Sequence, residues 1–191
     1  MNPADREQLL RALWPQGAAS PSVWAVLDGA RDARIHVALM QSRLDYRCLY
    51  AGTLARELEL AAPQLVELPY GHRLFDRWLD EGWASNWGVL LSIGDPANLR
   101  HHLRKLLKVE GVARRPVLFR FYDPRVLRAF LPQATAEQLR EFFGPIDAWY
   151  AVDGEGALMA YRCDRQQRLQ VQRAVVVTPA VSPAVLITPG G

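Results

Sequence analysis

Few residues of the chain stand where they could perform chemistry, and Asp28 is the most prominent of them. It follows five consecutive apolar residues, Val23 to Leu27, and α/β proteins often hold ligand-binding groups directly after such a strand. A phosphatase of the haloacid dehalogenase type would carry a second aspartate two residues later, where this chain has Ala30. We therefore interpret Asp28 and Gly29 as a turn that caps the next helix.

Other catalytic or cofactor motifs are missing from the sequence. No serine stands in a G-x-S-x-G elbow, and none of the four histidines has a recognisable spacing to a nucleophile. The dinucleotide and P-loop fingerprints are missing, and the two cysteines, Cys48 and Cys163, have neither CxxC spacing nor clustered histidines. We expect a protein that is not an enzyme and that has no metal site and no cofactor.

Basic side chains gather on one predicted helix, residues 96–108. Its leucines at positions 99, 103, 106 and 107 form an apolar stripe that would face the core. A basic amphipathic helix binds nucleic acid, an anionic membrane or an acidic protein, and it is also common as a solvated face. The candidate partner-binding residues in and after this helix are Arg100, Arg104, Lys105, Lys108 and Arg115.

Trp83 is the aromatic candidate for the same role. It stands in a predicted loop between Glu81 and Asn86, and exposed aromatic side chains anchor protein interfaces. Trp78 and Trp87 are interpreted as core residues, because one completes a helical stripe and the other begins a strand.

Composition narrows the possible function classes. The chain has 191 residues, 50% of them hydrophobic, and a net charge of +3, which favours one folded domain with a real core. No apolar run exceeds five residues, whereas a membrane helix needs about 20, and charged residues interrupt the N-terminus where a signal peptide would be apolar. We expect a cytosolic protein without a membrane segment. The small net charge argues against nucleic acid as a partner, and nucleic-acid binding stays the alternative function for helix 96–108.

The elements that must position these residues alternate between strands and helices. The patterns predict strands at 23–27, 47–50, 65–68, 87–93 and 117–122, and helices at 3–14, 33–43, 74–79, 96–108, 124–131 and 135–143. This alternation predicts an α/β fold with a mainly parallel sheet covered by helices. Further β-like runs at 147–153, 157–163 and 169–177 predict a C-terminal hairpin, followed by a Pro-rich tail. We divide the chain into an N-terminal helix and linker (1–22), an α/β domain (23–145), a β-like extension (146–177) and the tail (178–191).

Several motifs together resemble one family. They are Val26-Leu27-Asp28-Gly29-Ala30-Arg31-Asp32, Ser85-Asn86-Trp87-Gly88-Val89, and the block from Leu118 to Leu127 that reads L-F-R-F-Y-D-P-R-V-L. The chain resembles the bacterial type VI secretion adaptor/chaperone family (Tap or TEC type, catalogued as a domain of unknown function) over about residues 23–145. The resemblance implies a cytoplasmic, non-enzymatic adaptor that holds a toxic effector and loads it onto its cognate VgrG spike protein.

The motif residues themselves are expected to be structural. These family-motif residues are Asp28, Gly29, Trp87, Gly88, Arg120, Tyr122, Asp123, Pro124 and Arg125. Asp123 is predicted to cap a helix whose first residue is Pro124. Arg125 and Asp28 occupy similar positions after strands, and we expect them to form an ion pair.

Overall fold

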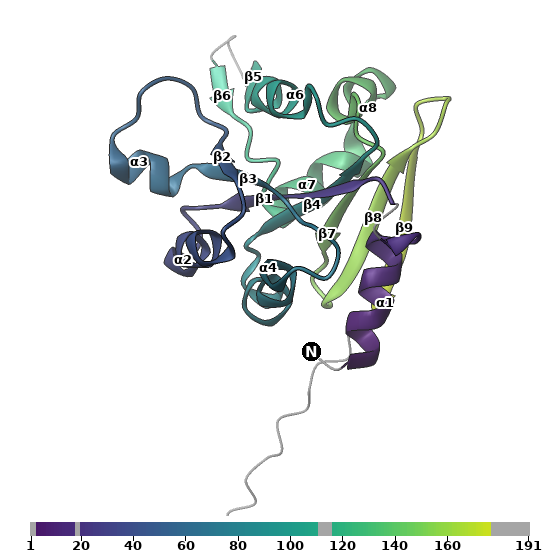
Figure 1. Cartoon of the computed structure of the whole chain (residues 1–191). Coiled ribbons are helices and arrows are strands. Elements are labelled where there is room, and N and C mark those ends of the chain that lie inside the picture. Colours follow the sequence, from purple (N-terminus) through teal and green to yellow (C-terminus); the bar gives the residue numbers. More distant parts are fainter. Residues whose placement is uncertain (1–2, 18–19, 111–115, 177–191) are drawn as a thin grey trace, which may run out of the picture.

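Seven strands form one sheet through the middle of the molecule, and every hydrogen-bonded pair in it is antiparallel (Figure 1). The computed structural model describes residues 3–17, 20–110 and 116–176. The strand order is β2-β3-β1-β4-β7-β8-β9. The strands are β1 (Ser22–Asp28), β2 (Tyr46–Cys48), β3 (Pro63–Glu67), β4 (Gly88–Ile93), β7 (Ala148–Val152), β8 (Ala157–Cys163) and β9 (Leu169–Val176).

The predicted mainly parallel sheet is therefore wrong. Crossover helices do join parallel strands here: α2 leads from β1 to β2, and α4 leads from β3 to β4. In each case, however, another strand lies between the two, because β3 separates β1 from β2 and β1 separates β3 from β4. The apolar run of β1 reports burial on both faces of the sheet, which does not depend on the direction of the neighbouring strands.

Helices cover both faces of the sheet (Figure 1). One core cluster joins α1, α2 and α4 to one face through residues such as Leu13, Leu39 and Phe75. The other joins α6, α7 and α8 to the opposite face through residues such as Leu103 and Phe142. The helices are α1 (Pro3–Leu13), α2 (Ala33–Ser42), α3 (Arg56–Ala61), α4 (Arg73–Arg77), α5 (Trp83–Ser85), α6 (Leu99–Leu106), α7 (Pro124–Phe130) and α8 (Ala136–Phe143), with a π-helical turn at Trp78–Gly82 and a 3-10 turn at Leu131–Gln133.

The C-terminal strands continue the central sheet. β7 pairs with β4, and β8 and β9 follow it as an antiparallel meander. Helix α1 packs against β9, so the first and the last described elements lie side by side (Figure 1). The predicted Pro-rich tail, residues 178–191, lies outside the described residues.

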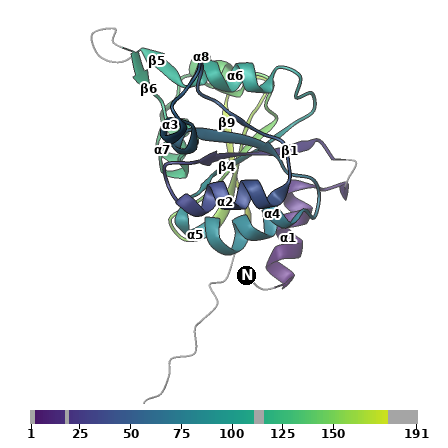
Figure 2. The ribbon, with the colours of Figure 1, turned by 60° about the vertical axis from the view of Figure 1, so that its left-hand side comes forward.

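A second, two-stranded sheet stands apart from the first. β5 (Lys108–Glu110) pairs with β6 (Pro116–Leu118) in an antiparallel hairpin, which stands at the edge of the molecule beside α6 (Figure 2). The predicted strand 117–122 is therefore mostly wrong, since only its first two residues extend the hairpin. The predicted helix 96–108 is real but shorter, because α6 gives way to β5 at Lys108.

Within the part of the chain that the structure describes, no helix is both long enough and apolar enough to cross a bilayer.

Candidate functional site: a basic groove and a half-buried ion pair

Asp28 ends β1 and forms an ion pair with Arg120. The aspartate side chain is 2% exposed, and its Oδ2 lies 2.5 Å from Nη2 of Arg120. The backbone N–H of Ala30 donates to the other carboxylate oxygen at 3.3 Å, as in the predicted turn. Burial and the hydrogen bond to Asp28 act in opposite directions on the pKa of Arg120, which is raised overall.

The expected ion pair between Asp28 and Arg125 is wrong. Arg125 instead donates to Asp123 from Nη2 at 2.6 Å and from Nε at 2.9 Å. Arg125 lies in the first turn of α7, two residues after Asp123, so its guanidinium reaches the nearer carboxylate. The residue that reaches Asp28 belongs to the segment before α7.

Asp123 caps α7, as the sequence predicts. Its carboxylate accepts the backbone N–H of Arg125 at 2.9 Å, and Pro124 follows at the first helical position. Burial alone would raise the pKa of Asp123, but the side-chain and backbone hydrogen bonds from Arg125 outweigh it and lower that pKa. The Asp123 carboxylate therefore stabilises the first turn of α7.

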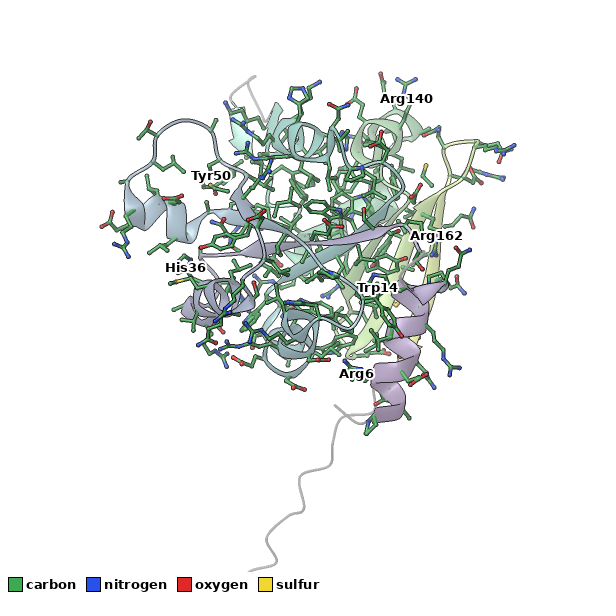
Figure 3. All side chains as sticks on the ribbon, viewed as in Figure 1. Arg6, Trp14, His36, Tyr50, Arg140 and Arg162 are labelled. Atoms are coloured by element: carbon green, nitrogen blue, oxygen red, sulfur yellow. The ribbon has the colours of Figure 1, made fainter. Side chains whose placement is uncertain are left out.

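Tyr122 contacts both Arg120 and Tyr50. Its hydroxyl lies 3.4 Å from the hydroxyl of Tyr50, and the guanidinium of Arg120 lies 5.8 Å from the centre of its ring. Burial raises the pKa of the Tyr122 hydroxyl, which keeps the phenol neutral. Figure 3 labels Tyr50 on the segment that follows β2.

Two glycines of the motifs are required by close backbone contacts. A Cβ at Gly29 would lie 2.0 Å from the carbonyl oxygen of Leu60, and a Cβ at Gly88 would lie 2.0 Å from that of Val26. The neighbouring Trp87 is fully buried, and its indole N–H donates to Asp32 at 2.9 Å. These residues hold the start of β4 against the end of β1.

Trp83 is not an exposed anchor, contrary to the sequence prediction. It is 7% exposed, its ring packs edge-on against Trp78 at 5.3 Å, and its indole N–H donates to the carbonyl of Gly156 at 3.3 Å. The segment predicted as a loop is helical from Trp78 to Ser85, and this turns Trp83 into the core.

The predicted basic residues fall into two groups. The side chain of Arg100 donates to the carbonyl of Cys48 at 2.9 and 3.3 Å, so it ties α6 to β2. Arg104 is half-buried and Lys105 and Lys108 are exposed, and these three side chains lie on one side of α6 and the start of β5. Arg115 lies outside the described residues.

The second group borders a groove. This groove, of about 640 Å³, lies between α6, the segment after β2 and the β5–β6 hairpin. We call it the basic groove. It is lined by the basic residues His101, Arg104, Lys105 and Lys108 and by Leu49, Tyr50, Ala51, Leu54, Leu107 and Leu118.

Sequence reasoning missed the exposed apolar side chains of the β5–β6 hairpin, of which Leu118 lines the groove. Val109, Val117 and Leu118 on the hairpin are 40%, 48% and 49% exposed. The polar–apolar alternation at Lys108–Glu110 indicates a short strand. It was missed because the helical spacing of the preceding leucines led to a predicted helix that ended only at Lys108. The combination of cations and exposed apolar side chains is suited to binding another macromolecule.

The two cysteines, Cys48 and Cys163, are both free thiols. Burial raises the pKa of the Cys48 and Cys163 thiols, which disfavours the nucleophilic thiolate. Over residues 3–17, 20–110 and 116–176, no three side chains of His, Cys, Asp or Glu are grouped so that they could hold a metal ion.

Comparison with known proteins identifies one family. No curated protein and no solved structure matches the chain. A family profile with the description "Domain of unknown function (DUF4123)" matches residues 23–141, which run from β1 into α8 and include the Asp28–Arg120 pair, both glycines and α6 with its hairpin. Since this match covers more than half of the chain, the protein belongs to the DUF4123 family.

Proposed function

We propose that the protein is a cytoplasmic, non-catalytic adaptor that binds a type VI secretion effector and loads it onto a cognate VgrG spike protein. The observation that carries this proposal is the family match over residues 23–141, together with the motif residues that resemble the type VI adaptor/chaperone family. The match and the motifs cover the same part of the chain.

The contacts of the motif residues support a role in folding rather than in catalysis. Asp28 and Asp123 are the buried carboxylates of the motifs, and each is bound by an arginine. A general base needs a carboxylate that can reach substrate. An adaptor needs a surface for its partner, and the basic groove with its neighbouring hairpin is the surface that best fits a protein.

Co-expression is the direct test. The chain, with an affinity tag, is expressed together with the products of the neighbouring spike and effector genes, and the captured proteins are identified. We expect both the effector and the spike to be retained, and a spike protein from an unrelated cluster to be lost in the wash. Capture of neither partner, with both soluble, would contradict the proposal.

A further inference from the structure

Exposed apolar side chains concentrate on the β5–β6 hairpin. Of the eight large hydrophobic side chains exposed among the described residues, three belong to the hairpin: Val109, Val117 and Leu118. The hairpin contributes only three residue pairs. Of these three, Leu118 lines the basic groove, whereas Val109 and Val117 pair with each other and lie on the opposite face of the hairpin.

The hairpin is also a weak element by itself. An isolated two-stranded hairpin is marginally stable in water, and this one pairs with no strand of the central sheet. Lys108 pairs with Leu118 and Val109 with Val117, so successive pairs point to opposite faces. Leu118 and Lys108 line the basic groove, and a partner seated there would bury Leu118 and stabilise the hairpin.

The charge of the groove defines the partner's chemistry. Three cationic side chains line it, namely Arg104, Lys105 and Lys108, and no carboxylate occurs among the described lining residues. The carboxylates of α3, Glu57 and Glu59, are not part of the lining. An anionic segment would therefore meet the positive charges of Arg104, Lys105 and Lys108 along one wall, while Leu54 and Leu118 offer an apolar contact.

We propose that the basic groove is the docking site for an acidic segment of a partner protein, one that inserts at least one apolar side chain against Leu118 and Leu54. The inference rests on the proposed adaptor function and deepens it, because it names the chemistry of the segment that is bound. The occupant is a peptide segment rather than nucleic acid. Single-stranded nucleic acid is usually held by several stacking aromatic rings, and Tyr50 is the one aromatic residue among the described lining residues.

The test measures binding of a defined probe. A fluorescently labelled synthetic peptide of Glu and Leu, with Leu at every third or fourth position, is titrated with the protein and followed by anisotropy at low and high salt. We expect saturable binding that weakens as salt rises, and no binding of the matching Lys and Leu peptide. The groove variants are the triple charge reversal Arg104→Glu, Lys105→Glu and Lys108→Glu, and the single variant Leu118→Asp.

Control variants at other exposed positions distinguish a loss of groove contacts from a general effect of the changed net charge. Arg11, Arg140 and Arg165 are exposed on α1, α8 and the β8–β9 turn, and Figure 3 labels Arg140. Reversing these three to Glu changes the net charge by the same amount. Val171 is exposed to the same fraction as Leu118, 49%, so Val171→Asp is the control for Leu118→Asp. Circular dichroism confirms that each variant is folded.

The expected result is a loss of affinity that is confined to the groove variants. Exposed charge pairs each contribute modestly, so three of them together give about a tenfold weaker dissociation constant. Leu118→Asp should weaken binding by about tenfold as well, whereas both controls stay within about twofold. No binding of the acidic peptide, equal losses in the control variants, or tighter binding of a single-stranded oligonucleotide than of the peptide would overturn the inference.

The same variants distinguish this inference from the proposed function. If the protein binds the acidic peptide in the groove but captures neither effector nor spike, the adaptor function fails and the groove assignment stands. If the protein captures both partners and the groove variants capture them equally well, the adaptor function stands and the groove assignment fails.

Discussion

Removing the guanidinium of Arg120 should destabilise the protein more than removing the charge of its partner. Arg120 is 45% exposed at its side chain, whereas Asp28 is 2% exposed. In Arg120→Met the carboxylate of Asp28 stays buried without its cation. In Asp28→Asn the arginine can be solvated instead, and the amide can still accept the N–H of Ala30.

The magnitude follows from this asymmetry. Breaking a fully buried ion pair by removing one partner costs about 3–5 kcal/mol, and the partial exposure of Arg120 reduces that figure through solvent screening. We expect Arg120→Met to lower the free energy of unfolding by about 2 kcal/mol, or the melting temperature by roughly 4–8 °C. Asp28→Asn should cost about 1 kcal/mol, and the double variant should show a coupling of about 1 kcal/mol.

The assay is urea unfolding followed by tryptophan fluorescence for the wild type, both single variants and the double variant. A second cycle with Asp28→Asn and Arg125→Met is the control, because Arg125 pairs with Asp123 instead. The control cycle should be additive within about 0.5 kcal/mol. A neutral Arg120→Met, or a control cycle with equal coupling, would refute the ion-pair reasoning.

Three further predictions concern stability. Gly88→Ala should cost more than about 3 kcal/mol or prevent folding, because its Cβ would lie 2.0 Å from the carbonyl oxygen of Val26; Gly154→Ala, which meets nothing within 4 Å, should be nearly neutral in the same urea titration. Burial lowers the pKa of His102, so below about pH 6.5 the unfolded state binds a proton that the folded state resists, and the free energy of unfolding decreases as the pH falls. Between pH 7 and 5 this decrease should be smaller in His102→Gln. An unchanged decrease would show that another group causes it. The lowered pKa of Asp123 adds stability above about pH 4 that is lost as the pH falls further. Asp123→Asn should keep the helix cap at a cost under about 1 kcal/mol at pH 7, and its free energy of unfolding should depend less on pH between pH 4 and 2. An equally steep loss of stability in the variant would contradict the prediction.

The spacing of apolar residues predicted most helices and strands because it reflects which side chains are buried. The spacing of Leu9, Leu10 and Leu13 predicts α1, and these residues do lie in the core. The apolar runs of β1, β7 and β8 likewise predict strands in the interior. The cap at Asp123 was predictable because it depends only on residues next to it in the chain.

The features that sequence reasoning missed depend on partners distant in the chain. The direction of β1 relative to β3 and β4 arises from strand order, which no local pattern records. Whether Asp28 meets Arg120 or Arg125 depends on the path of the segment before α7. Trp83 was misplaced because a π-helical turn, which has no strong sequence signal, precedes it.

The place of β7 in the sheet has a consequence for how the chain folds during synthesis. β4 is buried along its whole length, yet its partner β7 is about 55 residues further along the chain. At about 5–20 residues per second, the ribosome needs roughly 3–11 s to add them. During that interval the backbone N–H and C=O groups along one edge of β4 stay unpaired while its apolar side chains are exposed, and such strands are prone to aggregate. Slower translation between α6 and β7 would lengthen this exposure, and synonymous rare codons in that interval should lower the soluble yield without changing a single residue.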